Sequence, residues 1–355
     1  MTEMTENSPQ PVTIYDVAKA AGVAPSTVSR TFARPGRVKA ETAARVRAAA
    51  EQLGYRANPI GHALSVTQTR LLGIMVSDVA NPFHATLIRG AQLAASAAGY
   101  ELLLLDCRES GVRERTALER LVPVVDGFVI ASSRMPDSAL RTIAKQRPTV
   151  VLNRQMRDVS CLVSDTVTGT RAALGLLAEL GHESVVYVSG PEASWAEGVR
   201  YRTVRDHGNA LGLHTQKIGP FLPVFDGGLA AARVLLQKPP TAVIAYNDLM
   251  AIGVMNGFIR AGVHVPDQVS IIGFDDILMS RLTLPTLTTV AAPIRRMGKA
   301  AVNNVVAMIN GAKRQSPDAL VMPVNLMVRG STGPRGRVRL PMDAAPAVTL
   351  PRPVR

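Results

Sequence analysis

Two hydrophobic patterns divide this chain. In residues 13–57, apolar side chains recur at the spacing of amphipathic helices. From Leu71 onward, short continuous runs of Leu, Ile and Val alternate with amphipathic stretches. Such runs are typical of buried parallel strands in βαβ units. We therefore predict an all-α head and an α/β core, and the number of units indicates two lobes of doubly wound parallel sheet rather than one.

The second pattern gives the expected elements of the core. The apolar runs predict strands over residues 72–76, 101–105, 127–131, 149–152, 160–163, 184–188, 241–245 and 269–273. The amphipathic stretches predict helices that include residues 82–98, 138–146, 169–180, 226–236 and 247–261. Ligands of such sheets bind outside the carboxyl ends of the strands, so a site is expected at that edge.

Residues 13–32 predict two short helices with a tight break between them. Thr13 and Asp16 form the Ser/Thr-x-x-acid pattern of a capping box. Gly22 suits the positive φ at a helix C-terminus, and Pro25 suits the first position of a second helix. Val28 is expected to face inward. The outer faces of the second helix carry Ser26, Thr27, Ser29 and Arg30. This is the layout of a helix-turn-helix.

The outward row of side chains suits double-stranded DNA. A B-form major groove admits one α-helix, and Ser, Thr and Arg can reach its base edges. Arg30 is the main candidate, because bidentate bonding to guanine is worth about 1–3 kcal/mol of discrimination. A solvated surface helix is the alternative interpretation. A basic loop with Arg34, Arg37 and Lys39 follows, and a third helix is expected from about 40 to 53.

Composition sets further bounds. The formal net charge of +13 fits a polyanionic partner, and it also fits compositional bias. Cys107 and Cys161 form no disulfide or metal framework and are expected to be small buried residues. The polar, acidic N-terminus is not a signal peptide, and no apolar run approaches the roughly 20 residues that span a bilayer. We therefore expect a soluble, cytoplasmic protein without a membrane partner.

The sequence lacks the motifs of common enzymes. No G-x-G-x-x-G follows the first expected strand, and there is no P-loop, nucleophile elbow or H-E-x-x-H. The histidines show no metal spacing, and His182 is interpreted as part of a structural turn. We expect that the protein is not an enzyme and that it holds no cofactor or metal.

Two stretches resemble a known family. TIYDVAKAAGVAPSTVSRTF (residues 13–32) and EQLGYRANPIGHALSVTQTRLLGIMV (from Glu51) are similar to the head, hinge and first core strand of the lactose-repressor (LacI/GalR) transcription regulators. The resemblance runs from about Thr13 to Gly330 and implies a two-lobed core like that of periplasmic sugar-binding proteins. The implied parts are a disordered tail (1–12), the head (13–57), a hinge helix and linker (58–69), the core (70–330) and a basic Pro-rich tail (331–355).

Within the implied core, lobe 1 covers about 70–168 and 290–320. Lobe 2 covers about 169–287, with a last strand near 323–330. Prolines in the C-terminal tail exclude the appended heptad helix that tetramers of this family need, so a homodimer is expected.

The resemblance implies a sequence-specific DNA-binding regulator, expected to be a repressor, that binds a near-palindromic operator as a dimer. A small sugar-like effector would control DNA binding allosterically, and whether it releases or promotes binding stays open. Leu64 stands where the family inserts a minor-groove wedge. The implied DNA contacts are Thr13, Tyr15, Pro25, Ser26, Thr27, Ser29, Arg30, Arg37, Tyr55, Asn58 and Leu64.

Several polar residues stand at expected strand ends, and the resemblance implies effector contacts there and at Arg200 in the helix that follows Pro191. Carboxylates and amides form hydrogen bonds with vicinal hydroxyls, and arginine can donate to two oxygens at once. An aromatic ring can cover an apolar face of a sugar. Asp248 and Asp276 are expected to cap helices instead. A sugar-binding transport component is the rival interpretation, and a metabolic enzyme is the third. The candidates are Asn81, Phe83, Asp106, Arg154, Arg200, Phe221, Asn247 and Asp275, with Trp195 as a second candidate ring.

Overall fold

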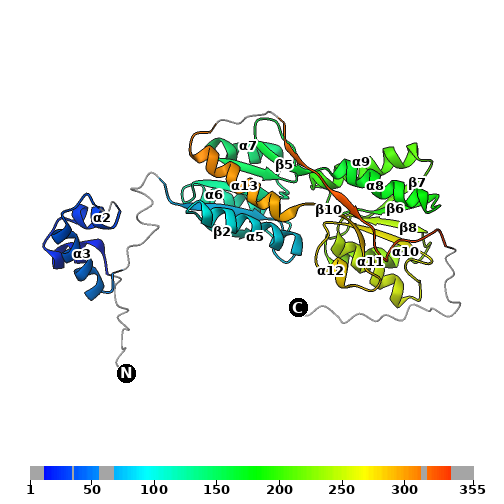
Figure 1. Ribbon diagram of the computed structural model, residues 1–355, viewed down its shortest axis with the longest axis horizontal. Helices are drawn as coiled ribbons and strands as arrows, with labels where there is room; N and C mark the ends of the chain where they lie inside the picture. Colours follow the sequence, from blue (N-terminus) through cyan, green and yellow to red (C-terminus); the bar gives the residue numbers. More distant parts are fainter. Residues whose placement is uncertain (1–11, 34–35, 56–67, 313–317, 337–355) are drawn as a thin grey trace, which may run out of the picture. The chain divides into compact units, whose positions relative to one another are not determined.

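The protein divides into two compact units, residues 1–70 and 71–355 (Figure 1). The computed structural model describes residues 12–33, 36–55, 68–312 and 318–336. Asn58 and Leu64 lie outside the described residues, as do most of the expected hinge and of both expected tails.

The head unit is a three-helix fold that begins with the predicted capping box. Thr13 donates to Asp16 through its backbone N–H at 2.8 Å and its hydroxyl at 2.6 Å. Gly22 ends the first helix with a φ of 65°. Val17 and Val28 are fully buried between the helices, so the predicted helix-turn-helix is confirmed. The helices are α1 (Ile14–Ala21), α2 (Pro25–Ala33) and α3 (Ala40–Gln52).

Lobe 1 of the second unit is a parallel sheet with the strand order β11-β5-β4-β3-β1-β2. Helices α5 and α13 pack on one face, and α6 and α7 pack on the other. The strands are β1 (Leu71–Val76), β2 (Glu101–Asp106), β3 (Gly127–Ala131), β4 (Thr149–Leu152), β5 (Ser160–Ser164) and β11 (Leu320–Met322). The helices are α5 (Pro82–Ala97), α6 (Gly111–Leu121), α7 (Asp137–Gln146) and α13 (Ile294–Ile309).

Lobe 2 repeats this plan with the order β12-β10-β9-β8-β6-β7, in which only β12 is antiparallel to its neighbour among the described strands. Helices α8 and α9 pack on one face, and α10 and α11 on the other. The strands are β6 (Ser184–Val188), β7 (His214–Ile218), β8 (Ala242–Ala245), β9 (Ser270–Phe274), β10 (Thr288–Ala291) and β12 (Asn325–Met327). The helices are α8 (Thr166–Glu179), α9 (Trp195–Ala210), α10 (Phe225–Leu235), α11 (Asp248–Arg260) and α12 (Met279–Leu282).

The two doubly wound lobes confirm the predicted fold class. Three strands were not predicted: β11, which has only three residues, and the strands β7 and β10. Strand β7 has the sequence HTQKI and lies at the sheet edge, where its side chains are exposed or half-buried. Strand β10 has the sequence TTVA, which is too short and too rich in threonine to form an apolar run. Both strands therefore lack the signal that identified the buried ones.

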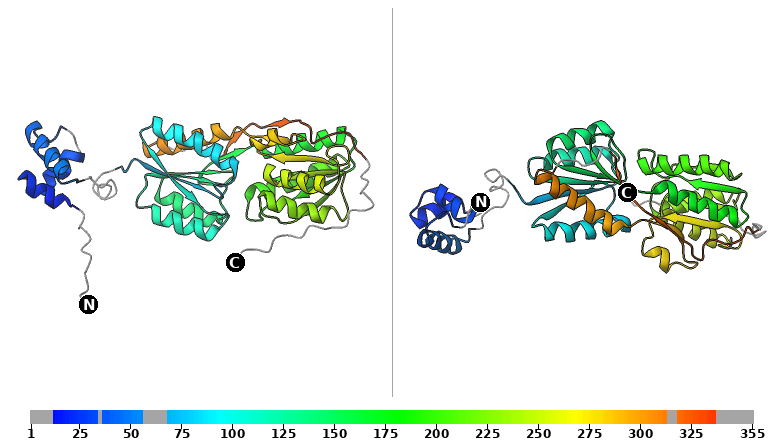
Figure 2. Two further views of the ribbon diagram at one scale, coloured as in Figure 1. Left: turned by 90° about the horizontal axis from the view of Figure 1, so that it is seen from below. Right: turned by 45° about the horizontal axis from the view of Figure 1, so that its top comes forward.

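The chain crosses between the lobes three times, and Figure 2 shows the last crossing in orange and red. The crossings follow β5, β10 and β11. The expected lobe bounds at 290 and 320 fall inside β10 and β11, which belong to the second and first sheets respectively. Each lobe is thus built from separated parts of the chain.

Two residue types expected to be structural are buried. Cys107 and Cys161 are 1% and 4% exposed, which confirms the prediction. The ring nitrogens of His182 lie 3.1 Å from the Thr241 hydroxyl and 3.0 Å from the Ser270 hydroxyl, so this side chain joins parts of lobe 2. Among the described helices, none combines the length and apolar character that a bilayer span requires.

Candidate ligand cleft and nucleic-acid interface

A cleft lies between the lobes of the second unit, at the carboxyl ends of strands from both sheets. This is the edge at which open parallel sheets bind their ligands. Lobe 1 contributes the segments that follow β1, β2, β3 and β4, and lobe 2 those that follow β6, β7, β8 and β9. The lining residues are Ser77, Asn81, Phe83, His84, Glu109, Ser132, Ser133, Arg134, Asn153, Ser194, Trp195, Ala196, Arg200, Pro223, Tyr246, Asn247 and Asp275.

The structure brings five of the predicted effector contacts together in this cleft: Asn81, Phe83, Arg200, Asn247 and Asp275. Trp195, the second candidate ring, lines it as well. The side chain of Asn81 also caps α5 by accepting from the backbone N–H of Phe83 at 3.0 Å.

Three predicted contacts lie outside the lining. Asp106 accepts from the backbone N–H of Val79 at 3.1 Å and pairs with Arg108. Arg154 is buried, and its guanidinium joins Asp137 to three backbone carbonyls, one of them Ala193 in lobe 2. Phe221 packs against the hydrophobic core. Strand-end position alone did not separate these residues from the lining ones.

At the lobe-2 end, Arg200 and Asp275 form a buried pair. Arg200 Nη2 lies 3.8 Å from Asp275 Oδ1. The guanidinium also lies over the Phe274 ring at 4.1 Å, and Nη1 donates to the Tyr246 carbonyl. Burial raises the pKa of Asp275 to about 7, although Arg200 acts in the opposite direction. Arg200 Nε has no hydrogen-bond partner within the described parts of the chain, so it can donate to a ligand.

Two residues were expected to cap helices, and the structure shows that neither does. The first is Asp248, in the segment that follows β8. Asn247 caps α11, because its side chain accepts from the Met250 N–H at 2.9 Å. The prediction for Asp248 is wrong, since that side chain is fully buried and accepts from the Thr289 hydroxyl at 2.6 Å. Burial, with Asp275 nearby, raises the pKa of Asp248 well above its ordinary value.

The prediction that Asp276 caps a helix is also wrong. Its carboxylate pairs with Arg281 at 2.6 Å and with Arg329, which ties the segment after β9 to the end of the described core. Neighbouring Asn and Asp residues are all chemically able to cap, so the sequence could not assign the role among them.

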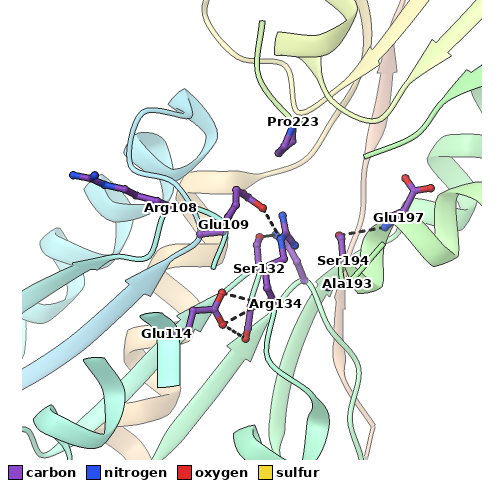
Figure 3. Close-up of polar contacts among 12 residues, drawn as sticks. Arg108, Glu109, Glu114, Ser132, Arg134, Ala193, Ser194, Glu197 and Pro223 are labelled. Carbon is purple, nitrogen blue, oxygen red and sulfur yellow. Dashed lines mark hydrogen bonds and ion pairs between the residues drawn. The ribbon is translucent and has the colours of Figure 1, made fainter. Parts of the chain in front are cut away.

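At the lobe-1 end lies a second ion pair, which the sequence analysis missed (Figure 3). Arg134 Nε donates to Glu109 Oε2 at 2.6 Å. Burial alone would lower the pKa of Arg134, but contacts with Tyr246 and Glu109 raise it above its ordinary value. Glu109 follows β2 and Arg134 follows β3, so their position after strands was the signal that could have found them.

A buried carboxylate holds the loop that carries Arg134. Glu114 of α6 accepts from the backbone N–H of Arg134 at 2.8 Å and from that of Met135 at 3.3 Å. The Ser133 hydroxyl donates to the same carboxylate. Burial raises the pKa of Glu114, and these hydrogen bonds oppose the shift. Figure 3 shows Glu114 beside this loop, with Arg134 and Glu109 next to it.

His84 is a further lining residue that the sequence analysis missed. It is 2% exposed, and its Nε2 lies 3.0 Å from the Ser77 hydroxyl. Burial, followed by the charge of Arg134, lowers the pKa of His84 to about 3. The imidazole is therefore neutral near pH 7, and Nδ1 has no partner among the residues that the structure describes.

Backbone strain marks the same edge of both sheets. Four lining residues that follow strands have positive φ: Glu109 (58°), Ser132 (57°), Asn153 (57°) and Asp275 (113°). Non-glycine residues in such regions cost about 1–3 kcal/mol each and cluster at ligand sites. The strain therefore points to this cleft as a binding site.

In the head unit, the predicted DNA contacts differ in exposure. Tyr15 is 70% exposed, and Thr13, Ser26, Arg30 and Arg37 are also exposed. Three further candidates are half-buried on the second helix: Pro25, Thr27 and Ser29.

Tyr55 is half-buried, with its ring 6.1 Å from that of Phe32. It packs against the head core.

Comparisons with known proteins cover both units. Residues 13–58 match the model of bacterial regulatory proteins of the lacI family, and residues 174–332 match that of the periplasmic binding protein-like domain. The HTH-type transcriptional repressor CytR of Escherichia coli K12 is 31% identical over 330 residues, which are 90% of this chain and 96% of that protein.

Solved structures agree along nearly the whole chain. The transcriptional regulator CelR in complex with cellobiose has a TM-score of 0.67 at 28% identity, covering 90% of this chain and 99% of that one. The lac repressor dimer bound to operator and the anti-inducer ONPF has a TM-score of 0.74 at 25% identity, covering 91% and 100%.

Proposed function

Because the chain belongs to the LacI family of bacterial regulatory proteins, we propose that it is a DNA-binding transcription repressor controlled by a small sugar-like effector. The observation that carries the proposal is the combination of an exposed helix-turn-helix face with a strained, polar cleft in a separate unit. It acts on DNA in the cytoplasm and catalyses no reaction.

The head reads DNA through α2. Arg30 lies on its exposed face, where a guanidinium can bond the O6 and N7 of guanine in the major groove. Tyr15 and Arg37 flank this helix in sequence and are exposed, so they suit backbone contacts. Asn58 and Leu64 of the hinge complete the proposed contact set, with Leu64 as a minor-groove wedge.

The effector binds in the cleft. Arg200 offers donors, and Asp275 offers acceptors, so a hydroxyl group can accept from one and donate to the other. CelR, a structural relative, holds cellobiose. Because the chain crosses between the lobes three times, a ligand that contacts both lobes can change their relative orientation.

Regulation requires that the effector favour one of two states of the protein. A ligand shifts an equilibrium only by its difference in affinity between the two states. The DNA-binding state is a homodimer on a near-palindromic operator, which matches a two-fold protein axis. The operator-bound lac repressor, a relative in structure, is a dimer.

A sugar-binding transport component would share the core but has no use for the head. The test is binding of the full chain to the intergenic DNA beside its own gene, with and without candidate sugars. We expect sequence-specific binding with a Kd that one sugar changes at least about tenfold, the lower part of typical allosteric coupling. Failure to distinguish this DNA from a scrambled duplex under every condition contradicts the proposal.

A further inference from the structure

The cleft is lined by equal numbers of arginines and carboxylic acids. The charged side chains of the lining are two arginines, Arg134 and Arg200, and two carboxylic acids, Glu109 and Asp275. His84 adds no charge near pH 7, because burial lowers its pKa to about 3. Each lobe supplies one arginine and one acid, so neither end of the cleft has an excess cation when both acids are ionised. At the lobe-2 end this requires a pH above about 7, the raised pKa of Asp275.

The lobe-1 pair is fixed in place before any ligand arrives. Its side chains are 6% exposed at Arg134 and 19% exposed at Glu109, and they are joined at 2.6 Å. Glu114 holds the backbone of Arg134 from one side. On the other side, Arg108 and Glu109 adopt φ values of 46° and 58°, a strained turn that presents the Glu109 carboxylate to the cleft.

Such a pair discriminates between neutral and anionic groups. A hydroxyl can donate to Glu109 and accept from Arg134 without disturbing the charge balance. A phosphate or carboxylate at the same place would meet the Glu109 carboxylate in a partly desolvated site, where like charges repel strongly. The same reasoning holds at the lobe-2 end when Asp275 is ionised.

We infer that the effector is an uncharged, hydroxyl-bearing compound, and that Glu109 and Arg134 recognise its lobe-1 end, opposite the contacts with Arg200 and Asp275 already proposed above. This inference rests on the proposed function, since it names the class of effector for the same cleft. Glu109 is the residue that excludes phosphorylated and acidic sugars.

The chain provides its own probe of the cleft. Trp195 is the single tryptophan in the sequence, and it lines the cleft, so its fluorescence responds to occupancy there. Inorganic phosphate tests the charge balance without knowledge of the effector. The full-length protein is titrated with phosphate at constant ionic strength and at about pH 8, where Asp275 is ionised, as wild type, Glu109→Gln and Glu119→Gln.

Glu109→Gln leaves the Arg134 guanidinium without its carboxylate, whereas Glu119→Gln removes one acid from the exposed face of α6 in the same lobe. We expect a phosphate-dependent change of Trp195 fluorescence in Glu109→Gln only, with binding at least about tenfold tighter than in wild type. Phosphate binding by wild type overturns the inference, and so does a folded Glu109→Gln that ignores phosphate. Circular dichroism shows whether each variant is folded. Glu109→Asp changes the side chain but keeps its negative charge, so it should not bind phosphate.

Matched sugars give the second test. D-ribose is compared with ribose 5-phosphate, and D-glucose with glucose 6-phosphate and glucuronate, for release or promotion of operator binding. A neutral member that acts at lower concentration than its anionic partners supports the inference. An anionic member that acts at lower concentration overturns it while leaving the repressor function intact. Absence of any operator binding contradicts the repressor function instead. In that case the phosphate titration still tests whether the cleft excludes anionic groups.

Discussion

At the residue scale, the cleft and the head use arginine in different surroundings. Arg200 is buried between Asp275 and two aromatic rings, so its orientation is fixed before a ligand arrives. Arg30 is exposed on α2, so its orientation is set by the duplex that it meets. A preset guanidinium favours selection of a small ligand, because little rotamer entropy is lost on binding.

Arg30 is expected to provide specificity rather than general affinity. Arg30→Ala should weaken binding to the operator by about 1–3 kcal/mol, the value of a bidentate contact to guanine. Binding to scrambled DNA should fall much less, and the salt dependence should change little. Fluorescence anisotropy with both duplexes measures the two affinities. An equal loss on both duplexes would identify Arg30 as a phosphate contact.

Asp275 is expected to make stability depend on pH. Its pKa is raised from 3.8 to about 7, so between these values the folded state binds the proton more tightly than the unfolded chain does. Wild type therefore loses stability from this group as the pH rises from about 4 to 7. Asp275→Asn removes the loss, which by linkage is at most about 4 kcal/mol.

Urea unfolding of both proteins at several pH values measures this effect. The midpoint of Asp275→Asn should rise relative to that of wild type as the pH increases, and level off above about pH 7. A difference between the two proteins that does not vary with pH would show that Asp275 is not held in this environment.

At the scale of elements, close helix pairs on one face of each sheet define the lobes. Helices α10 and α11 approach so closely that a Cβ at Gly253 would overlap the Phe225 carbonyl, and a Cβ at Gly228 would overlap that of Met250. Gly175 in α8 has open space around its Cβ position. The same residue type therefore has opposite roles in two helices of lobe 2.

These two glycines give a matched pair of variants. Gly253→Ala should destabilise the protein by about 1–3 kcal/mol through overpacking. Gly175→Ala should be neutral or stabilising by up to about 1 kcal/mol, because alanine is the better helix former. Thermal unfolding monitored by circular dichroism compares them. Equal behaviour of both variants would contradict the close contact between α10 and α11.

Local signals in the sequence predict the elements well, and contacts between distant residues limit the prediction of the site. The capping box at Thr13, the turn at Gly22 and the start of α2 at Pro25 depend on neighbours a few residues away, and all three are present. The pair of Glu109 and Arg134 depends on strands β2 and β3 lying on either side of β1. No periodicity within either segment carries that information.

The choice among adjacent polar residues was also beyond the sequence. Asn247 and Asp248 are both able to cap α11, and only the packing of β10 against this segment buries Asp248 beside Thr289. Arg154 was predicted to contact the ligand because it follows a strand. Its guanidinium instead donates hydrogen bonds to backbone carbonyls of both lobes.

At the scale of the whole molecule, an exposed apolar segment suits the proposed dimer. Leu278, Leu282 and Leu284, in and around α12, are 66%, 70% and 88% exposed. Apolar residues gathered on a surface in this way mark interaction sites, whereas single exposed leucines are common. A second copy of the chain is the occupant that the repressor proposal requires.

Leu282→Asp should therefore weaken self-association by at least about 2 kcal/mol, because it would bury an unpaired charge in the interface. Leu211→Asp is the control, since Leu211 is an exposed leucine that follows α9. Sedimentation velocity over a range of concentrations measures the dimer dissociation constant. Unchanged association of Leu282→Asp would place the interface elsewhere, and operator affinity should fall in parallel if the dimer is the binding form.

The three crossings between the lobes also determine the order in which parts of the protein can fold during translation. Strand β11 is an edge of the first sheet and β12 an edge of the second, so the first sheet is complete only after Met322 has been synthesised and the second only after Met327. The head, whose own core lies within residues 14–55, leaves the ribosome long before that at about 5–20 residues per second. During translation, the head of each nascent chain can therefore be folded for many seconds before the two lobes that form the ligand cleft are complete.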